Sequence, residues 1–337
     1  IHSLKDQVGD YNILYQTIVA IFTYIGDKSI YYYKILSIFF DFCMAISAAI
    51  FACELSKKEK NDKVFFVTFA AVIMLPTVIL NSAYWGQCDS IYTTFIILTL
   101  LYLYREKYHR AFMFLGIAFA FKMQTIFIFP FIICFYIYKK QFSIFELLIT
   151  VFTFWISGIG AFVQGRSLLD PFRIYANQTG TYQYMHVNFP SFWMFVGNDY
   201  EWLKTAAIVM AAGICGMGLY IIMKRKLDCS RPENFVSIAS WFIWTCVLFL
   251  PAMHERYAYP LEILLVILTC INKDYLKYSS VAILFSLFTY GNYLFSNGGL
   301  DKYIVIIYAG CYLHFTYTIL KKNSKAATVT DKEMQNE

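Results

Sequence analysis

Long apolar runs separated by short polar segments follow one another along almost the whole chain. Each run is about as long as a helix that crosses the hydrocarbon core of a bilayer, which needs roughly 20 residues. We expect spans near residues 30–53, 64–80, 87–104, 111–121, 126–138, 145–163, 205–223, 235–250, 257–271, 278–296 and 303–320. The pattern therefore predicts an all-α, polytopic transmembrane helix bundle with about 10–11 spans in this sequence.

The basic residues favour one orientation of these spans. The segments 57–63, 105–110, 139–140, 224–231, 273–277 and 321–325 together carry 18 of the 28 Lys and Arg residues. Basic loops remain on the cytoplasmic side of a membrane, so we expect a multi-pass protein with a cytoplasmic C-terminus; the resemblance given below implies the cell membrane as its location. The alternation holds only if 111–138 is broken into two short helices that meet at Lys122.

The two ends of the chain differ from the bundle. Residues 1–29 are expected to hold the end of an outer loop with an interfacial helix, and we expect a fragment whose first helix is missing. Residues 30–320 form the predicted bundle and include a long aromatic outer loop at 164–204. The polar composition of 321–337 predicts a disordered cytoplasmic tail.

The composition excludes several classes of protein. The chain is 59% hydrophobic and only 15% charged, whereas soluble domains are about one-quarter charged. A soluble enzyme and a nucleic-acid-binding protein are therefore excluded, because such an apolar surface would not stay in water. The net charge of +6 follows the membrane topology, and the expected partners are membrane lipids rather than nucleic acid.

Polar clusters lie at the outer ends of the predicted spans. Ionisable groups at such depth are costly and mark functional sites. Because four distant segments share this face, we expect them to meet in one pocket. The candidate residues are Asp10, Trp85, Gln87, Asp89, Lys122, Gln124, His254, Glu255, Arg256 and Tyr257.

Simpler interpretations exist for several of these residues. Trp85 fits an interfacial belt of aromatic residues, and Asp89 could cap a helix that begins at Ser90. Arg256 could reach toward the interface as an anchor, with Glu255 as its partner. Lys122 sits between two apolar half-helices, so a water-filled cavity or an anionic ligand is its expected partner.

The ordered clusters resemble the GT-C class of multi-spanning glycosyltransferases, which use lipid-linked sugars. The nearest likeness is to the bacterial branch related to the GPI mannosyltransferase 2 family. The matching segments are Gly9-Asp10-Tyr11-Asn12 with Tyr15, Trp85-Gly86-Gln87-Cys88-Asp89, Phe121-Lys122-Met123-Gln124, Asn188-Phe189-Pro190-Ser191-Phe192-Trp193 and His254-Glu255-Arg256-Tyr257. The likeness is spread over nearly the whole chain, although Cys88 stands where the family usually has an aromatic residue.

The resemblance implies a GT-C bundle that transfers a hexose, mannose by family default, from a polyprenyl-phosphate carrier. The acceptor would be a hydroxyl of a glycan, a lipid or a protein on the extracytoplasmic face, with inversion at the anomeric centre. Asp10 and Asp89 would be catalytic, unless the base is an aspartate upstream of Ile1. The other eight candidates would bind substrate. No cofactor or metal ligand is expected, and nothing in the sequence indicates a divalent cation.

A transporter or lipid-carrier flippase is the alternative function. It would need polar residues through both halves of the membrane, and Asp41 is the candidate near mid-depth. Asp41 fits either a proton path or a packed polar contact between helices. The third hypothesis is an assembly protein without catalysis, in which the outer polar clusters would stay scattered.

Overall fold

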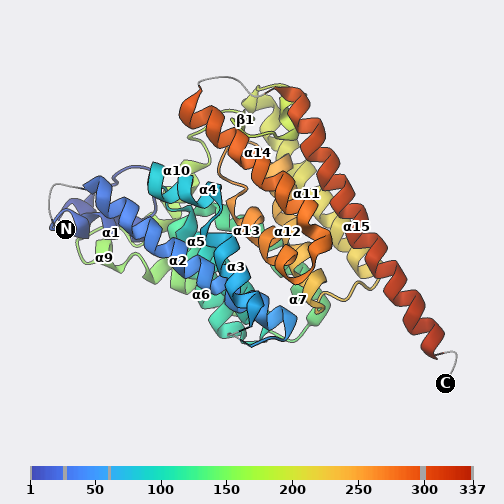
Figure 1. The fold of residues 1–337 in the computed structure, drawn as a ribbon. Helices are drawn as coiled ribbons and strands as arrows, with labels where there is room; N and C mark the ends of the chain where they lie inside the picture. The colour runs from blue at the N-terminus through green and yellow to red at the C-terminus, as the bar shows by residue number, and fades with distance from the viewer. Residues whose placement is uncertain (1, 26–28, 60–61, 297–300, 335–337) are drawn as a thin grey trace. The chain divides into compact units, whose positions relative to one another are not determined.

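A computed structural model describes residues 2–25, 29–59, 62–296 and 301–334 of the chain (Figure 1). The chain divides into two compact units. Unit 1 comprises Ile1–Phe129 and Lys140–Gln183, and unit 2 comprises Pro130–Lys139 and Tyr184–Glu337. Apart from one pair of two-residue strands, the regular elements of the described residues are helices. The all-α prediction is confirmed at this level.

Unit 1 is built around α5, which packs against both α2 and α6. Helix α3 covers α2, and α8 covers α6. The elements are η1 (His2–Lys5), α1 (Ile13–Phe22), α2 (Ser29–Ser56), α3 (Lys63–Ile73), α4 (Pro76–Ile79), η2 (Leu80–Trp85), α5 (Asp89–Tyr104), α6 (Tyr108–Phe121), η3 (Met123–Ile128), α8 (Glu146–Ile156), α9 (Ile159–Phe162) and α10 (Asp170–Gln178).

Unit 2 is built around α12, whose interior is almost wholly buried and which packs against α11, α13 and α15. Its strands β1 and β2 pair in parallel, with His186 opposite Met253 and Val187 opposite His254. The elements are α7 (Phe129–Lys139), β1 (His186–Val187), η4 (Phe192–Met194), α11 (Tyr200–Lys224), α12 (Pro232–Phe249), β2 (Met253–His254), α13 (Tyr259–Ile271), η5 (Lys273–Tyr275), α14 (Leu276–Phe295) and α15 (Lys302–Met334).

Each apolar run predicted to span the membrane is helical for most of its length. In the described part of the chain, three helices are long and apolar enough to cross a membrane, namely Ile30–Ser56, Tyr200–Lys224 and Lys302–Lys322. The pair Lys63–Ile73 and Pro76–Trp85 makes a fourth if its 48° bend lies within one span. Several other apolar helices are shorter; α5, for example, has 16 residues and is about 24 Å long. The number of 10–11 spans stays a prediction.

The C-terminal boundary differs from the expected one. We predicted a disordered tail from residue 321, but α15 continues to Met334. The reason lies in the composition of this segment, where Lys and Ala residues keep a good helix propensity without apolar character. The apolar part of the helix does end near the expected position, at Lys322. Residues 335–337 of the predicted tail lie outside the described residues, as do 26–28, 60–61 and 297–300 of the predicted loops.

Candidate functional site

The turn that contains Trp85 and Gln87 is formed by a π-helix and a left-handed glycine. Element η2 is π-helical and ends at Gly86, whose φ of 79° lies in the left-handed region. A residue with a Cβ is strained in this conformation. The Gly86 amide donates to the Ser82 carbonyl at 3.0 Å, and the Gln87 amide donates to the Asn81 carbonyl at 2.9 Å. The chain therefore turns at Gly86 and enters α5 at Asp89.

Asp89 is the first residue of α5, and its carboxylate is completely buried. The Asn81 Nδ2 atom donates to Asp89 Oδ2 at 2.8 Å, and the Lys122 ammonium donates to Asp89 Oδ1. The positive end of the helix dipole also favours an anion at this position. The capping interpretation of Asp89 is wrong, since Cys88 is the N-cap residue of α5. The carboxylate instead accepts hydrogen bonds from an amide and an ammonium.

Lys122 lies at the predicted break, and the break is confirmed. Helix α6 ends at Phe121, and Lys122 has an extended backbone with φ −154° and ψ 133° before the 3₁₀ turn η3 begins. Its side chain is only 9% exposed, and its Nζ atom lies 5.5 Å from the centre of the Tyr92 ring. We expected a water-filled cavity or an anionic ligand as its partner. The partner is Asp89, because an ion pair offsets the desolvation of both charges.

Two neighbouring groups enlarge this polar cluster. Asp41 on α2 is buried and accepts a hydrogen bond from Ser82 Oγ at 2.7 Å. The interpretation of Asp41 as a packed polar contact between helices is confirmed. In η3, Gln124 is buried, and the buried hydroxyl of Thr125 has no hydrogen-bond partner among the described residues.

The segment around Asp10 reaches this turn through a tyrosine. The Tyr11 hydroxyl donates to Gln87 Oε1 at 3.3 Å, and its ring lies 4.4 Å from the buried Tyr15 ring. Asp10 itself is exposed. Unit 1 thus brings together Tyr11, Gln87, Asp89 and Lys122 through a chain of contacts, with Asp10 one residue away from it.

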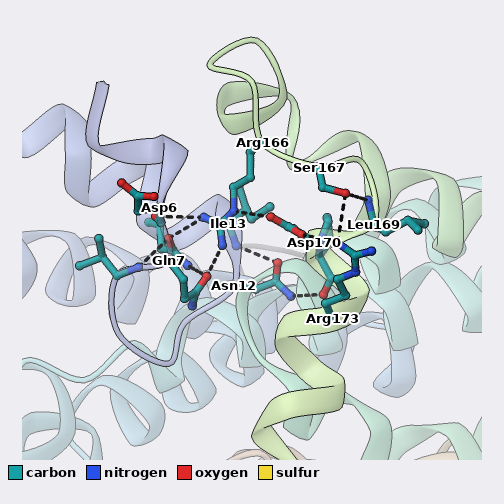
Figure 2. Close-up of polar contacts among 12 residues, drawn as sticks. Asp6, Gln7, Asn12, Ile13, Arg166, Ser167, Leu169, Asp170 and Arg173 are labelled. Atoms are coloured by element: carbon teal, nitrogen blue, oxygen red, sulfur yellow. Dashed lines mark hydrogen bonds and ion pairs between the residues drawn. The ribbon is translucent and has the colours of Figure 1, made fainter.

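A buried arginine that the sequence analysis did not single out holds the Asp10 segment in place (Figure 2). The Arg166 side chain is 3% exposed. Its Nε donates to Asp170 Oδ2 at 2.9 Å, and its Nη1 donates to Gln16 Oε1 at 3.1 Å. Its Nη2 donates to Gln7 Oε1. One feature of the sequence could have pointed to Arg166: it lies in a predicted outer loop, where basic residues are infrequent.

Asn12 makes a second connection between the same two segments. Its side-chain oxygen accepts from the Ile13 amide at 2.7 Å and caps α1. Its Nδ2 donates to the Pro171 carbonyl at 3.0 Å. The loop that carries Asp10 and Tyr11 is therefore anchored on both sides of these two residues.

Unit 2 holds the His254-Glu255-Arg256-Tyr257 element between α12 and α13. It begins in β2 after Ala252, which has a φ of 56°. Both His254 and Glu255 are buried. The Arg256 Nη1 atom donates to Glu255 Oε1 at 2.6 Å, and the His254 ring lies 5.0 Å from the Tyr257 ring. We considered Arg256 either as an anchor paired with Glu255 or as a substrate-binding residue. The ion pair with Glu255 is present, and it positions the guanidinium.

The charge state of Glu255 follows from these partners. Burial alone would raise its pKa, but the neighbouring His254 ring, whose Nδ1 lies 3.8 Å from Glu255 Oε2, and the positive charge of Arg256 outweigh burial, so the pKa of Glu255 is lowered. Glu255 is therefore an anion at neutral pH. Burial also lowers the pKa of His186 in β1, so His186 is neutral there.

The part of the aromatic loop from Tyr184 to α11 packs within unit 2. The Trp193 Nε1 atom donates to the Phe249 carbonyl at 2.7 Å, and the Phe189 ring contacts that of Tyr308 at 5.8 Å. Asn188 has a φ of 50°, in the left-handed region. This segment is therefore an ordered part of unit 2, joined to the His254 segment by the β1–β2 pair.

The candidate residues form two groups, one in each unit. Six of them belong to unit 1, namely Asp10, Trp85, Gln87, Asp89, Lys122 and Gln124, and four belong to unit 2, namely His254, Glu255, Arg256 and Tyr257. The meeting of the two groups in one pocket stays a prediction. Sequence reasoning placed Asn81 in the polar segment before α5 but did not include it among the candidate residues, and it missed Tyr92, which lies one helical turn after Asp89. No family model and no curated protein matches this chain.

Proposed function

We propose that this protein is a membrane glycosyltransferase of the GT-C type. It would transfer a hexose from a polyprenyl-phosphate carrier to an acceptor hydroxyl on the extracytoplasmic face of the cell membrane. The observation that carries the proposal is the buried Asp89–Lys122 pair. It lies at the junction of the Trp85 turn and the α6 break, and Tyr11 reaches the same turn through Gln87.

Lys122 would stabilise the charge of the leaving group. The phosphodiester of the donor carries one negative charge, and the phosphate monoester that leaves carries a second as the bond to the sugar breaks. An ammonium in a water-poor site stabilises this added charge far better than one in water. An anionic donor would compete with Asp89 for Lys122.

Asp89 would then be available as the base. The acceptor oxygen attacks the anomeric carbon while the bond from that carbon to the phosphate oxygen breaks, and its electron pair leaves with the phosphate. The acceptor proton passes to the carboxylate. Asp10, exposed beside Tyr11, is the second candidate for this role. A direct displacement of this kind inverts the anomeric centre.

The group in unit 2 fits a second clamp for the phosphate. Arginine presents a planar fork that matches phosphate oxygens, and Glu255 holds the Arg256 guanidinium from one side at 2.6 Å. His254 next to it is buried, and its Nδ1 lies 3.8 Å from Glu255 Oε2. The His254–Tyr257 element would therefore bind a phosphate within unit 2.

The transporter hypothesis has less support. It requires ionisable groups that exchange partners through the membrane, whereas the Asp41 carboxylate is engaged by Ser82 in a packed contact. Asp41 thus has a structural role that needs no transport. We therefore favour the enzyme.

The test is sugar transfer in membranes that contain full-length protein and a polyprenyl-phosphate hexose. We expect Asp89→Asn and Lys122→Ala each to abolish transfer while the protein still inserts. The matched controls are Glu54→Gln and Arg105→Ala, which break the half-exposed pair between α2 and α5, where Arg105 Nε donates to Glu54 Oε2 at 2.9 Å. These controls should keep most of the activity.

The double variant Asp89→Leu with Lys122→Met separates catalysis from folding. Replacing both members of a buried pair by apolar residues is often neutral for stability, so this protein should fold and remain inactive. Wild-type transfer by the double variant would overturn the assignment of the site.

A further inference from the structure

An apolar groove lies in unit 2 among α11, α12 and α15. It encloses a cavity of about 330 Å³, a size within the usual range of small-molecule sites. Helices α11 and α15 are two of the helices that are long and apolar enough to cross a membrane. If these two helices cross the membrane, the groove faces the hydrocarbon of the bilayer.

The polar atoms of the groove wall are already hydrogen bonded within the protein. The Trp241 Nε1 atom donates to Thr316 Oγ1 at 2.8 Å, and the Tyr312 hydroxyl bonds to Thr245 Oγ1 at 2.8 Å. Gly218 allows the floor of the groove to form, since a Cβ there would lie 2.4 Å from the Trp241 ring. The wall thus presents carbon to any occupant, which favours a hydrocarbon chain.

The groove is open along one side. Met217 on α11 and Leu313 on α15 both line it and are 60% and 65% exposed. A chain that enters between them would come from the lipid side. The acyl chain would then contact Met217 and Leu313 in place of the surrounding bulk lipid.

One end of the groove carries a concentration of basic residues. Its lining there includes Ile222, Leu227 and Leu320. Lys224, Arg225 and Lys226 lie between the first two, and Lys321 follows the third. The segments 224–233, 273–277 and 321–322 hold eight basic and three acidic residues.

The acidic residues at this end are engaged in ion pairs. Glu233 and Asp274 both accept from Lys322, at 3.4 and 3.0 Å, and Asp228 pairs with Arg231. Lys224, Arg225 and Lys226 are exposed at the C-terminal end of α11. They are suited to an anionic lipid headgroup at the membrane surface.

We propose that this groove is a binding site for an anionic diacyl phospholipid. One acyl chain lies between α11 and α15 over Trp241, and the phosphate contacts Lys224, Arg225 and Lys226. The complementarity of an apolar groove with a basic end carries the proposal. It does not depend on the proposed glycosyl transfer.

The first test measures thermal unfolding of the purified full chain in detergent. Phosphatidylglycerol should raise the Tm by several degrees more than phosphatidylcholine with the same acyl chains. Met217→Trp and Leu313→Trp fill the groove and should remove this shift. Val209→Trp and Ile307→Trp are the matched controls, because these residues are 65% and 63% exposed on the same helices but do not line the groove. The controls should keep the shift.

The second test addresses the headgroup by native mass spectrometry. The triple variant Lys224→Gln, Arg225→Gln and Lys226→Gln should bind phosphatidylglycerol about tenfold or more weakly, while its phosphatidylcholine binding stays unchanged. Equal binding of the two lipids by the wild-type chain would overturn the proposal. So would an unchanged shift in Leu313→Trp, or displacement of phosphatidylglycerol by an equimolar polyprenyl phosphate, which would make the groove a carrier site.

Discussion

At the scale of single residues, Asp89 and Lys122 each need the other. Both side chains are buried, and Asn81 is a further donor to the carboxylate. Removing one member leaves an uncompensated charge in a low-dielectric site, which costs about 3–5 kcal/mol. The pair is therefore a structural as well as a chemical unit.

We predict that Lys122→Met destabilises the protein by about 3–5 kcal/mol, and that adding Asp89→Leu restores most of this loss. The measurement is thermal unfolding in detergent of the two single variants and the double variant. Additive losses in the double variant would show that the two charges are not coupled.

The sequence identified both members of this pair but not the pairing. Each stands out as an ionisable residue beside an apolar run, which is a local signal. Their contact joins positions 33 residues apart and depends on how α5 packs against the α6 break. Arg166 was missed for a similar reason, because two of its partners, Gln7 and Gln16, are neutral and distant along the chain.

Glu255 provides a prediction about pH. Its pKa is lowered in the folded protein, so its contribution to stability is present above pH 4.5 and is lost as the pH falls through the lowered pKa. The difference in Tm between wild type and Glu255→Gln should stay constant from pH 7 to 5 and shrink below about pH 4.5. A difference that shrinks between pH 7 and 6 would mean that burial dominates instead.

At the scale of elements, the apolar runs predicted most helices. The alternation of basic loops predicted one break, at Lys122. Lys122 interrupts a stretch that hydropathy alone would read as one span. The bend between α3 and α4 was not foreseen, although Pro76 lies at the start of α4 and cannot donate a backbone hydrogen bond. The π-helix η2 was not predicted either. A single six-residue π-turn is too short to leave a recognisable pattern of apolar residues in the sequence.

Two glycines on α11 allow a matched prediction at this scale. A Cβ on Gly218 would lie 2.4 Å from the Trp241 ring, whereas a Cβ on Gly216 would meet no atom within 4 Å. We expect Gly218→Ala to lower stability by about 1–3 kcal/mol through overpacking, and Gly216→Ala to raise it by roughly 0.5–1 kcal/mol through helix propensity. Thermal unfolding of both variants checks the prediction, and equal effects would contradict the packing of α11 on α12.

At the scale of the whole molecule, the meeting of the two groups of candidate residues in one pocket stays a prediction. Sequence reasoning reached this prediction from the positive-inside pattern, which places both groups of candidates on the same face. The distribution of basic residues does not predict how the helices pack within each unit, because helix packing depends on which apolar faces contact one another.

Cross-linking tests the shared site. In a background without the half-buried native thiols of Cys43, Cys215, Cys270 and Cys311, a short bismaleimide should join Gln87→Cys to Arg256→Cys. The control pairs Gln87→Cys with Lys224→Cys, which we expect on the opposite side of the membrane, and should not react. Equal yields in the two pairs would contradict a common pocket.

The Arg166 contacts also constrain the order in which the protein can mature. Gln7 and Arg166 are separated by 159 positions, and ribosomes add about 5–20 residues per second, so roughly 10 to 30 s pass between their synthesis. Until then, a nascent chain has no guanidinium to tether the loop that bears Tyr11. The loop that bears Tyr11 can therefore be tethered only after the segment that follows α9 has been made, and translation stalled before Arg166 would leave this loop without its guanidinium contacts.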